Sequence, residues 1–86
     1  MMNYAAGWNI PGYLPENEPA KFKTFEEAKN YIIEELFRYR HELYDAGELD
    51  DAEAEQVEIE ILLLEKLEDE FAFKLGGYRF WVNLLY

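Results

Sequence analysis

The first regular pattern along the chain is an alternation of apolar residues with polar or small ones from Asn3 to Ile10. A period of two is typical of a strand with one buried face, so we predict a strand there. Its apolar face carries Tyr4, Ala6, Trp8 and Ile10. The residues from Pro11 to Lys23 contain all three prolines of the chain. Because proline lacks a backbone donor and is confined to edges and turns, this segment is predicted to be an extended surface loop.

A helix is predicted to begin after Thr24, because Thr24 to Glu27 has the form of a capping box. In this motif the threonine oxygen accepts from the backbone N–H three residues on, and the glutamate reaches back to the cap. Apolar residues then recur at steps of three and four and form one stripe. The stripe consists of Phe25, Ala28, Ile32, Leu36, Tyr39 and Leu43. Gly47, just past Ala46, is the expected stop.

A second helix is predicted to follow almost at once, with Asp50 as its cap and Glu53 at its third position. The short connection makes an antiparallel helical hairpin. The second helix is expected to run until Gly76-Gly77. Its apolar stripe consists of Val57, Ile61, Leu64, Leu67 and Phe71. Three other apolar residues fall outside the stripe, namely Ile59, Leu62 and Leu63. The first helix cannot shield them from water, so another part of the protein or a partner must do so.

The end of the chain alternates again, from Tyr78 to Leu85, and is predicted to be a closing strand in which Trp81 faces away from the core. The inward side carries Tyr78, Phe80, Val82 and Leu84. The predicted fold class is α+β in the order β-α-α-β, with the helical hairpin packed on a two-stranded antiparallel sheet of the terminal strands. At 86 residues, the chain has room for one domain, residues 1–86.

The composition describes an acidic protein with enough apolar residues for a core. Half of the residues are hydrophobic and 17% are aromatic, against a formal net charge of −11. This charge disfavours direct contact with nucleic acid phosphates or anionic membranes and favours basic protein surfaces. The chain has no cysteine. No apolar run is long enough for a membrane span, so we predict a cytoplasmic protein.

The usual catalytic side chains are scarce. The sequence has no serine or cysteine, and its only threonine, Thr24, is the predicted cap. His41 is the sole histidine and is expected at the surface, near the end of the first helix. The acidic segment from Asp45 to Asp51 lacks the ligand spacing of an EF-hand loop. We therefore predict a protein that is not an enzyme, with no catalytic residue, metal site or cofactor.

Acidic residues dominate the segment from Glu48 to Glu70, where Lys66 is the only base. On a helix, acids spaced three and four apart would form a negatively charged rod. The predicted partner-binding residues are Asp50, Asp51, Glu53, Glu55, Glu58, Glu60, Glu65, Glu68 and Asp69, together with Trp81. Two interpretations are open. Either the acids form a solvated face that keeps the protein soluble, or they dock on a basic protein partner by imitating nucleic acid phosphates.

A small structural or regulatory homodimer is the alternative to such docking. Aromatic side chains are more numerous than so small a core readily hides, and a tryptophan on the outer face of a sheet would be a suitable interface anchor. The residues available for this interface are Ile59, Leu62, Leu63 and Trp81. In a homodimer the acids would serve solubility alone.

Three stretches of the chain are distinctive. They are the run from Trp8 to Pro15 followed by Pro19, the segment from Thr24 to Ala28, and the closing Tyr78 to Val82. Together they resemble a group of small uncharacterised phage and prophage proteins, a likeness that covers both ends and the first helix and carries over no catalytic residue. The resemblance implies a mobile-element origin and an inhibitor of the anti-CRISPR or anti-restriction type in the bacterial host cell. Its expected action is to occlude a basic, nucleic-acid-binding surface of a defence complex through the acidic helix.

Overall fold

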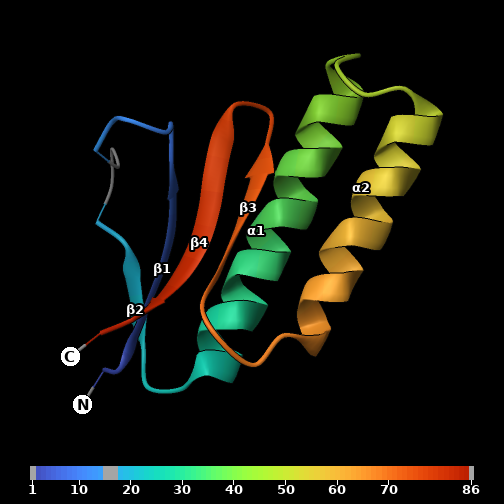
Figure 1. Ribbon diagram of the computed structural model, residues 1–86. Helices are drawn as coiled ribbons and strands as arrows, with labels where there is room; N and C mark the ends of the chain where they lie inside the picture. Colours follow the sequence, from blue (N-terminus) through green and yellow to red (C-terminus); the bar gives the residue numbers. More distant parts are fainter. Residues whose placement is uncertain (1, 15–17, 86) are drawn as a thin grey trace.

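The computed structural model describes residues 2–14 and 18–85. Met1, the loop residues from Pro15 to Asn17, and Tyr86 lie outside the described residues. Figure 1 shows the elements, which are β1 (Tyr4–Asn9), β2 (Ala20–Phe22), α1 (Phe25–Asp45), α2 (Asp51–Leu63), the short 3₁₀ helix η1 (Leu64–Lys66), β3 (Phe71–Leu75) and β4 (Tyr78–Leu84). The described part of the chain is α+β, as predicted, but its antiparallel sheet has four strands rather than two.

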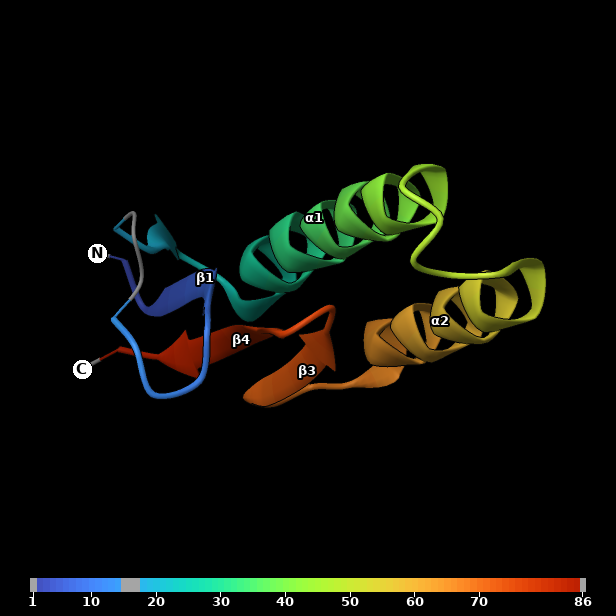
Figure 2. The same cartoon turned by 90° about the horizontal axis from the view of Figure 1, so that it is seen from above.

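The two terminal strands pair with each other, as their alternating patterns predicted. β1 and β4 run antiparallel, from Tyr4 opposite Leu84 to Asn9 opposite Arg79. β2 and β3 add to the outside of this pair and give the strand order β2-β1-β4-β3. Helix α1 packs on β1, β2 and β4 and so covers one face of the sheet (Figure 2).

β3 occupies residues that we predicted as the end of the second helix, and this prediction is wrong. Phe71 lies at helical spacing from Leu67, so it also extends a helical stripe. From Phe71 to Leu75, however, burial alternates with a period of two. Phe71, Phe73 and Leu75 are at least half-buried, whereas Ala72 and Lys74 are exposed. The pair Gly76-Gly77 is a hairpin turn between strands, with φ of +58° and +85°, as a tight two-residue turn requires.

β2 lies inside the segment that we predicted as loop. Ala20–Phe22 pairs with the first half of β1, with Tyr4 opposite Phe22 and Ala6 opposite Ala20. Phe22 anchors this short strand on α1, since its ring centroid is 5.2 Å from that of Tyr31. The strand is only three residues long and sits at the sheet edge directly after Pro19, where a neighbouring proline is tolerated.

Helix α1 has the start and the buried stripe that the sequence predicted. The Thr24 hydroxyl oxygen accepts from the backbone N–H of Glu27 at 3.2 Å. In the predicted stripe, Phe25 and Tyr39 are half-buried and the other members are buried. The most deeply buried large side chains are Ile32, Leu36, Ile61 and Val82. Removal of such apolar side chains from water is the main favourable contribution to folding.

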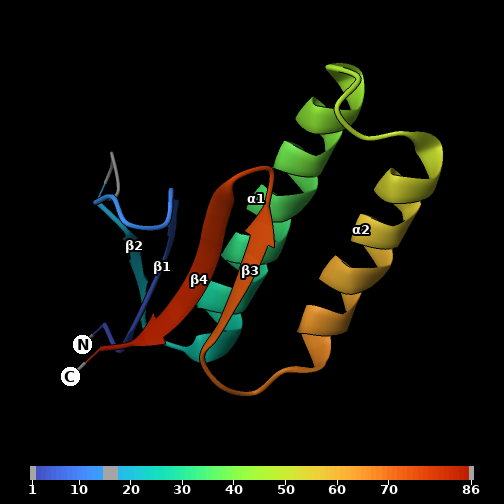
Figure 3. The same cartoon turned by 45° about the horizontal axis from the view of Figure 1, so that its top comes forward.

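Helix α2 packs on α1 and η1, and only α1 lies across the strands as predicted. Figure 2 and Figure 3 show α2 beside α1 and beyond the β3 edge of the sheet. The buried residues of α2 are Ala54 and Ile61. Because the sheet does not cover this helix, most of its circumference faces solvent.

Candidate docking surface on helix α2

Two basic side chains of α1 fasten the start of α2 and the η1 segment that follows α2. Lys29 is buried, with 4% of its surface exposed, and its Nζ donates to the carbonyl oxygens of Glu65 at 2.7 Å and Leu67 at 3.1 Å. At the other end, Nε of Arg40 donates to the carbonyl oxygen of Ala54 at 2.7 Å. The Lys29 bonds also satisfy carbonyls at the carboxyl end of the helical segment, which lack partners within a helix. Our sequence analysis missed both roles.

The first predicted acids of α2 stabilise its start. Oδ1 of Asp50 accepts from the backbone N–H of Glu53 at 2.8 Å, and Oε1 of Glu53 accepts from the backbone N–H of Asp50 at 3.1 Å, so the predicted cap is confirmed. The carboxylate of Asp51 accepts from the Tyr44 hydroxyl. This hydrogen bond raises the pKa of Tyr44, because it favours the protonated phenol. These three acids therefore have structural partners within the chain.

An apolar ridge runs along the solvent side of α2. The ridge consists of Ile59, Leu62 and Leu63, whose exposed fractions are 48%, 45% and 53%. Helical geometry places Ile59 on the side opposite Ile61, which faces α1. By the same geometry Glu58 and Glu60 lie on opposite sides of the ridge, and Glu55 lies in line with it, one turn before Ile59. The acids and the surplus apolar residues thus share one exposed surface, which we call the α2 docking surface (Glu55, Glu58, Ile59, Glu60, Leu62 and Leu63).

The carboxylates of the α2 docking surface have no basic partner among the described residues. Each salt bridge in that part of the chain joins two residues of α1. These pairs are Lys29 with Glu26, Arg38 with Glu35, and His41 with Asp45. No salt bridge among the described residues therefore neutralises these carboxylates, and their charge extends outward as an anionic field. Glu55 and Glu58 also border a shallow groove of about 320 Å³ between the two helices.

The remaining predicted acids lie away from this surface. Glu65 is in η1, and Glu68 and Asp69 are in the connection to β3, so the continuous acidic rod that we predicted ends at Leu63. The physical reason is that the helical conformation ends at Leu67, whose φ of −76° and ψ of 146° are those of extended backbone. His41 is exposed, as predicted, with Nε2 3.2 Å from Oδ2 of Asp45.

Trp81 is buried, which contradicts its predicted role as an exposed anchor. It does lie on the sheet face opposite Phe80, as the alternation indicated, but only 8% of its surface is exposed. Its Nε1 donates to Oδ1 of Asn9 at 2.8 Å. The ring covers Gly7, where an added Cβ would stand 3.2 Å from Cζ2 of Trp81 and 3.4 Å from Cβ of Pro19. The space left by glycine and the loop around Pro19 together bury this side chain.

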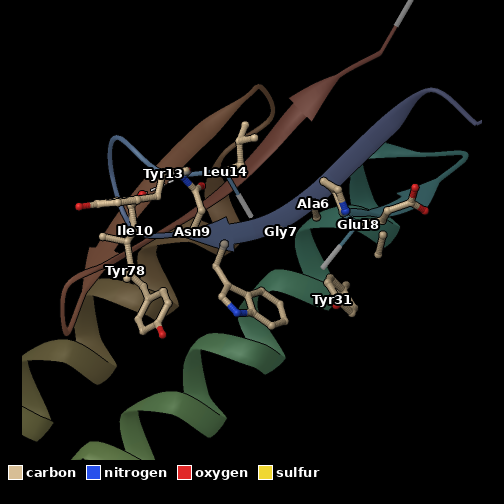
Figure 4. Close-up of a pocket in the computed structure, with 12 residues that line it drawn as sticks. Ala6, Gly7, Asn9, Ile10, Tyr13, Leu14, Glu18, Tyr31 and Tyr78 are labelled. Carbon is tan, nitrogen blue, oxygen red and sulfur yellow. Dashed lines mark hydrogen bonds between the residues drawn. The ribbon is translucent and has the colours of Figure 1, made fainter. Parts of the chain in front are cut away.

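Two aromatic cavities were also missed by the sequence analysis. The larger has a volume of about 380 Å³ and lies around Gly7, Trp8 and Asn9, the part of β1 that extends beyond its pairing with β2. Figure 4 shows Tyr31 reaching it from α1, while Tyr13 and Leu14 lie on the other side of the strand. The smaller, of about 240 Å³, lies between α1 and the ends of β1 and β4. Four of the rings that line these cavities, those of Trp8, Tyr39, Tyr78 and Phe80, were assigned to the core because periodicity does not reveal gaps between side chains.

Residues 2–14 and 18–85 contain neither a metal-binding cluster nor a membrane-spanning helix. No group of three or more histidine, cysteine, aspartate or glutamate side chains in this part of the chain could hold a metal ion. No helix among the same residues is both long and apolar enough to cross a membrane.

Comparison of the chain with protein-family models, with curated proteins and with solved structures gave no match.

Proposed function

We propose that this chain is a protein-binding module of the inhibitor or adaptor type, which inserts α2 into an apolar groove with a basic rim on a partner protein. The observation that carries the proposal is the apolar ridge of Ile59, Leu62 and Leu63, which is flanked by carboxylates that form no salt bridge among the described residues. In helix-in-groove recognition, apolar anchors provide most of the affinity. Charges on either side accelerate association and reject wrong partners.

This combination favours a protein groove over a surface that binds only phosphates. A partner shaped for nucleic acid alone would contact the carboxylates and leave the ridge in water. A groove with Lys or Arg along its rim would bury the ridge and neutralise Glu55, Glu58 and Glu60. If the rim of that groove also binds nucleic acid, docking would block it, which is the action expected of an anti-CRISPR or anti-restriction inhibitor.

A homodimer through α2 is less well supported. A second copy would bring its own Glu55, Glu58 and Glu60 against the same residues, and like charges across an interface oppose association. Trp81, the other predicted anchor, is buried. We therefore expect a monomer by sedimentation, and a stable dimer that is lost in an Ile59→Gln/Leu63→Gln variant would contradict the proposal.

Capture of partners from bacterial host lysate tests the docking mode with three variants. The charge variant reverses Glu55, Glu58 and Glu60 to lysine, and the ridge variant is Ile59→Gln/Leu63→Gln. The control reverses three exposed acids elsewhere to lysine, namely Glu34, Glu48 and Glu68. Glu53 is left intact in all of them because it belongs to the cap of α2.

We expect the protein to capture a specific partner at about 50 mM salt and to release most of it at about 500 mM, where surface charges are strongly screened. The charge variant and the ridge variant should each bind the partner with an affinity at least about tenfold lower, which corresponds to ~1.4 kcal/mol of binding free energy. The control should retain it. Equal losses in the control and the charge variant would show that only net charge matters, and full retention by the ridge variant would exclude groove insertion. Circular dichroism melts verify that each variant is folded.

A further inference from the structure

The smaller aromatic cavity is lined largely by aromatic rings. Its volume is about 240 Å³, and four rings line it, those of Trp8, Tyr39, Tyr78 and Phe80. Phe80 is 3% exposed and contacts the rings on either side, with centroid distances of 5.6 Å to Trp8 and 5.8 Å to Tyr39. Tyr39 in turn meets Tyr78 edge to face at 5.6 Å and 87°. The cavity therefore has aromatic surfaces on several sides.

The Tyr39 ring is held in place by its hydroxyl, which donates to the carbonyl oxygen of Gly76 at 3.0 Å. Burial raises the pKa of this phenol, and the nearby Tyr78, Glu48 and Glu42 raise it further. A phenol is protonated at neutral pH even at its ordinary pKa, so the hydroxyl keeps this hydrogen bond, and the raised pKa extends it to more alkaline pH.

The open side of the cavity is lined by charged residues of α1. Glu35, Arg38 and Glu42 are spaced at three, four and seven residues, so they project from one helix face. The Arg38 guanidinium is bonded to the Glu35 carboxylate. Glu42 belongs to no salt bridge among the described residues, so one negative charge is left at the rim. A ligand that enters past this rim meets a carboxylate first and aromatic faces behind it.

We propose that this cavity binds an alkylated ammonium ion, with the ring faces around the methyl groups and Glu42 as the countercharge. Aromatic faces attract cations through the negative charge of their π electrons, and a quaternary ammonium is weakly hydrated, so it enters such a site readily. An anion would be repelled at Glu42. A neutral apolar guest would partly desolvate that carboxylate without compensating its charge.

This site is independent of the α2 docking surface. It is formed by β1, β4 and the sheet-facing side of α1, and none of its lining residues belongs to α2. The charge and ridge variants described above should therefore bind ammonium ions like the unmodified protein. Failure of one proposal leaves the other standing.

Nuclear magnetic resonance of the two tryptophan indole N–H groups provides the test. Trp8 lines the cavity, whereas Trp81 lies on the opposite face of the sheet and donates to Asn9, so Trp81 is an internal control. A Trp8→Phe variant assigns the two signals. The probes are choline chloride and its neutral isostere 3,3-dimethylbutan-1-ol, titrated to about 50 mM against sodium chloride of equal ionic strength, because weak cation–π sites require high ligand concentrations.

We expect choline to shift the Trp8 signal in a saturable manner, to leave Trp81 unchanged, and to bind at least about fivefold more tightly than the neutral alcohol. A Glu42→Gln variant should weaken choline binding by about fivefold. Glu58→Gln, which removes an exposed carboxylate on α2 outside the cavity, should have no effect. A short peptide with trimethyllysine carries the same head group, and its affinity relative to choline distinguishes a protein side chain from a free metabolite as the source.

Three results would overturn the proposal. They are equal binding of the alcohol and choline, the absence of a saturable Trp8 shift, and unchanged choline affinity in Glu42→Gln. Because Glu42 is exposed, its substitution is not expected to disturb the fold, so a negative result cannot be attributed to unfolding.

Discussion

Replacement of Lys29 by methionine is expected to lower the free energy of unfolding by about 2–3 kcal/mol. Methionine can fill the space of the lysine stem but cannot donate to the carbonyl oxygens of Glu65 and Leu67, which Lys29 Nζ now reaches at 2.7 Å and 3.1 Å. The substitution also removes the ion pair with Glu26 at 3.4 Å and the contact with the Phe25 ring at 5.4 Å. For a domain of this size the corresponding fall in Tm is about 10–20 °C.

The matched control is Lys66→Met, which deletes the same charge from an exposed position in η1. We expect its effect to be within about 0.5 kcal/mol. Hydrogen exchange distinguishes a local loss of stability from a global one. Loss of the Lys29 hydrogen bonds should accelerate exchange in residues 64–70 before exchange in the sheet is affected. A Lys29→Met protein as stable as the Lys66→Met control would show that water replaces the Lys29 bonds without cost.

Alanine at Gly76 is expected to destabilise the protein by about 2–4 kcal/mol, since it combines an unfavourable backbone conformation with a steric clash. Gly76 has φ of +58°. A Cβ there would stand 2.7 Å from Oη and 2.8 Å from Cε2 of Tyr39. The Tyr39 ring would have to move from its place between Tyr78 and Phe80, and its hydroxyl would lose the bond to the Gly76 carbonyl.

Gly77→Ala separates the two contributions. Gly77 also has a positive φ, +85°, but no atom lies within 4 Å of an added Cβ. Its substitution should therefore carry only the conformational cost of about 1 kcal/mol. Denaturant melts of both variants measure the difference, and equal destabilisation would mean that Tyr39 moves aside freely. Free movement of Tyr39 would also weaken the case for a rigid aromatic cavity.

Local signals in the sequence predicted the elements that depend on neighbouring residues. The cap residues Thr24 and Asp50 located both helix starts, because each cap depends on a side chain and a backbone N–H three residues apart. Only Asp50 forms the complete capping box, since the Thr24 hydroxyl donates to Oε1 of Glu27 and no bond from Glu27 to the cap N–H is formed. Alternation located β1 and β4, each of which has one face on the core. β3 was mistaken for helix because Phe71 fits both a period of two and a helical stripe. β2 is too short to show a period at all.

The candidate sites were predicted less well, because they depend on contacts between distant residues. Thirty-six residues separate Lys29 from the Glu65 carbonyl that it binds, and no local pattern distinguishes a buried lysine from an exposed one. Trp81 was placed on the correct face of its strand, but its burial depends on Gly7 across the sheet and on Pro19 in the loop. Gly7 lies directly opposite Trp81 on the adjacent strand. This pairing would have indicated that Trp81 is buried, but it can be recognised only once the register of the two strands is known.

The way in which α2 is held on α1 has a consequence for the partner docking that we propose for this helix. Lys29 and Arg40 bind backbone carbonyl oxygens, which every amino acid provides, so these attachments do not depend on the side chains that α2 presents to solvent. Folding therefore places little constraint on the outward residues between Glu55 and Leu63. In the docking mode that we propose, the helix would be a replaceable element on a constant scaffold, and its outward residues could be redesigned for a new target while the sheet and α1 are kept unaltered.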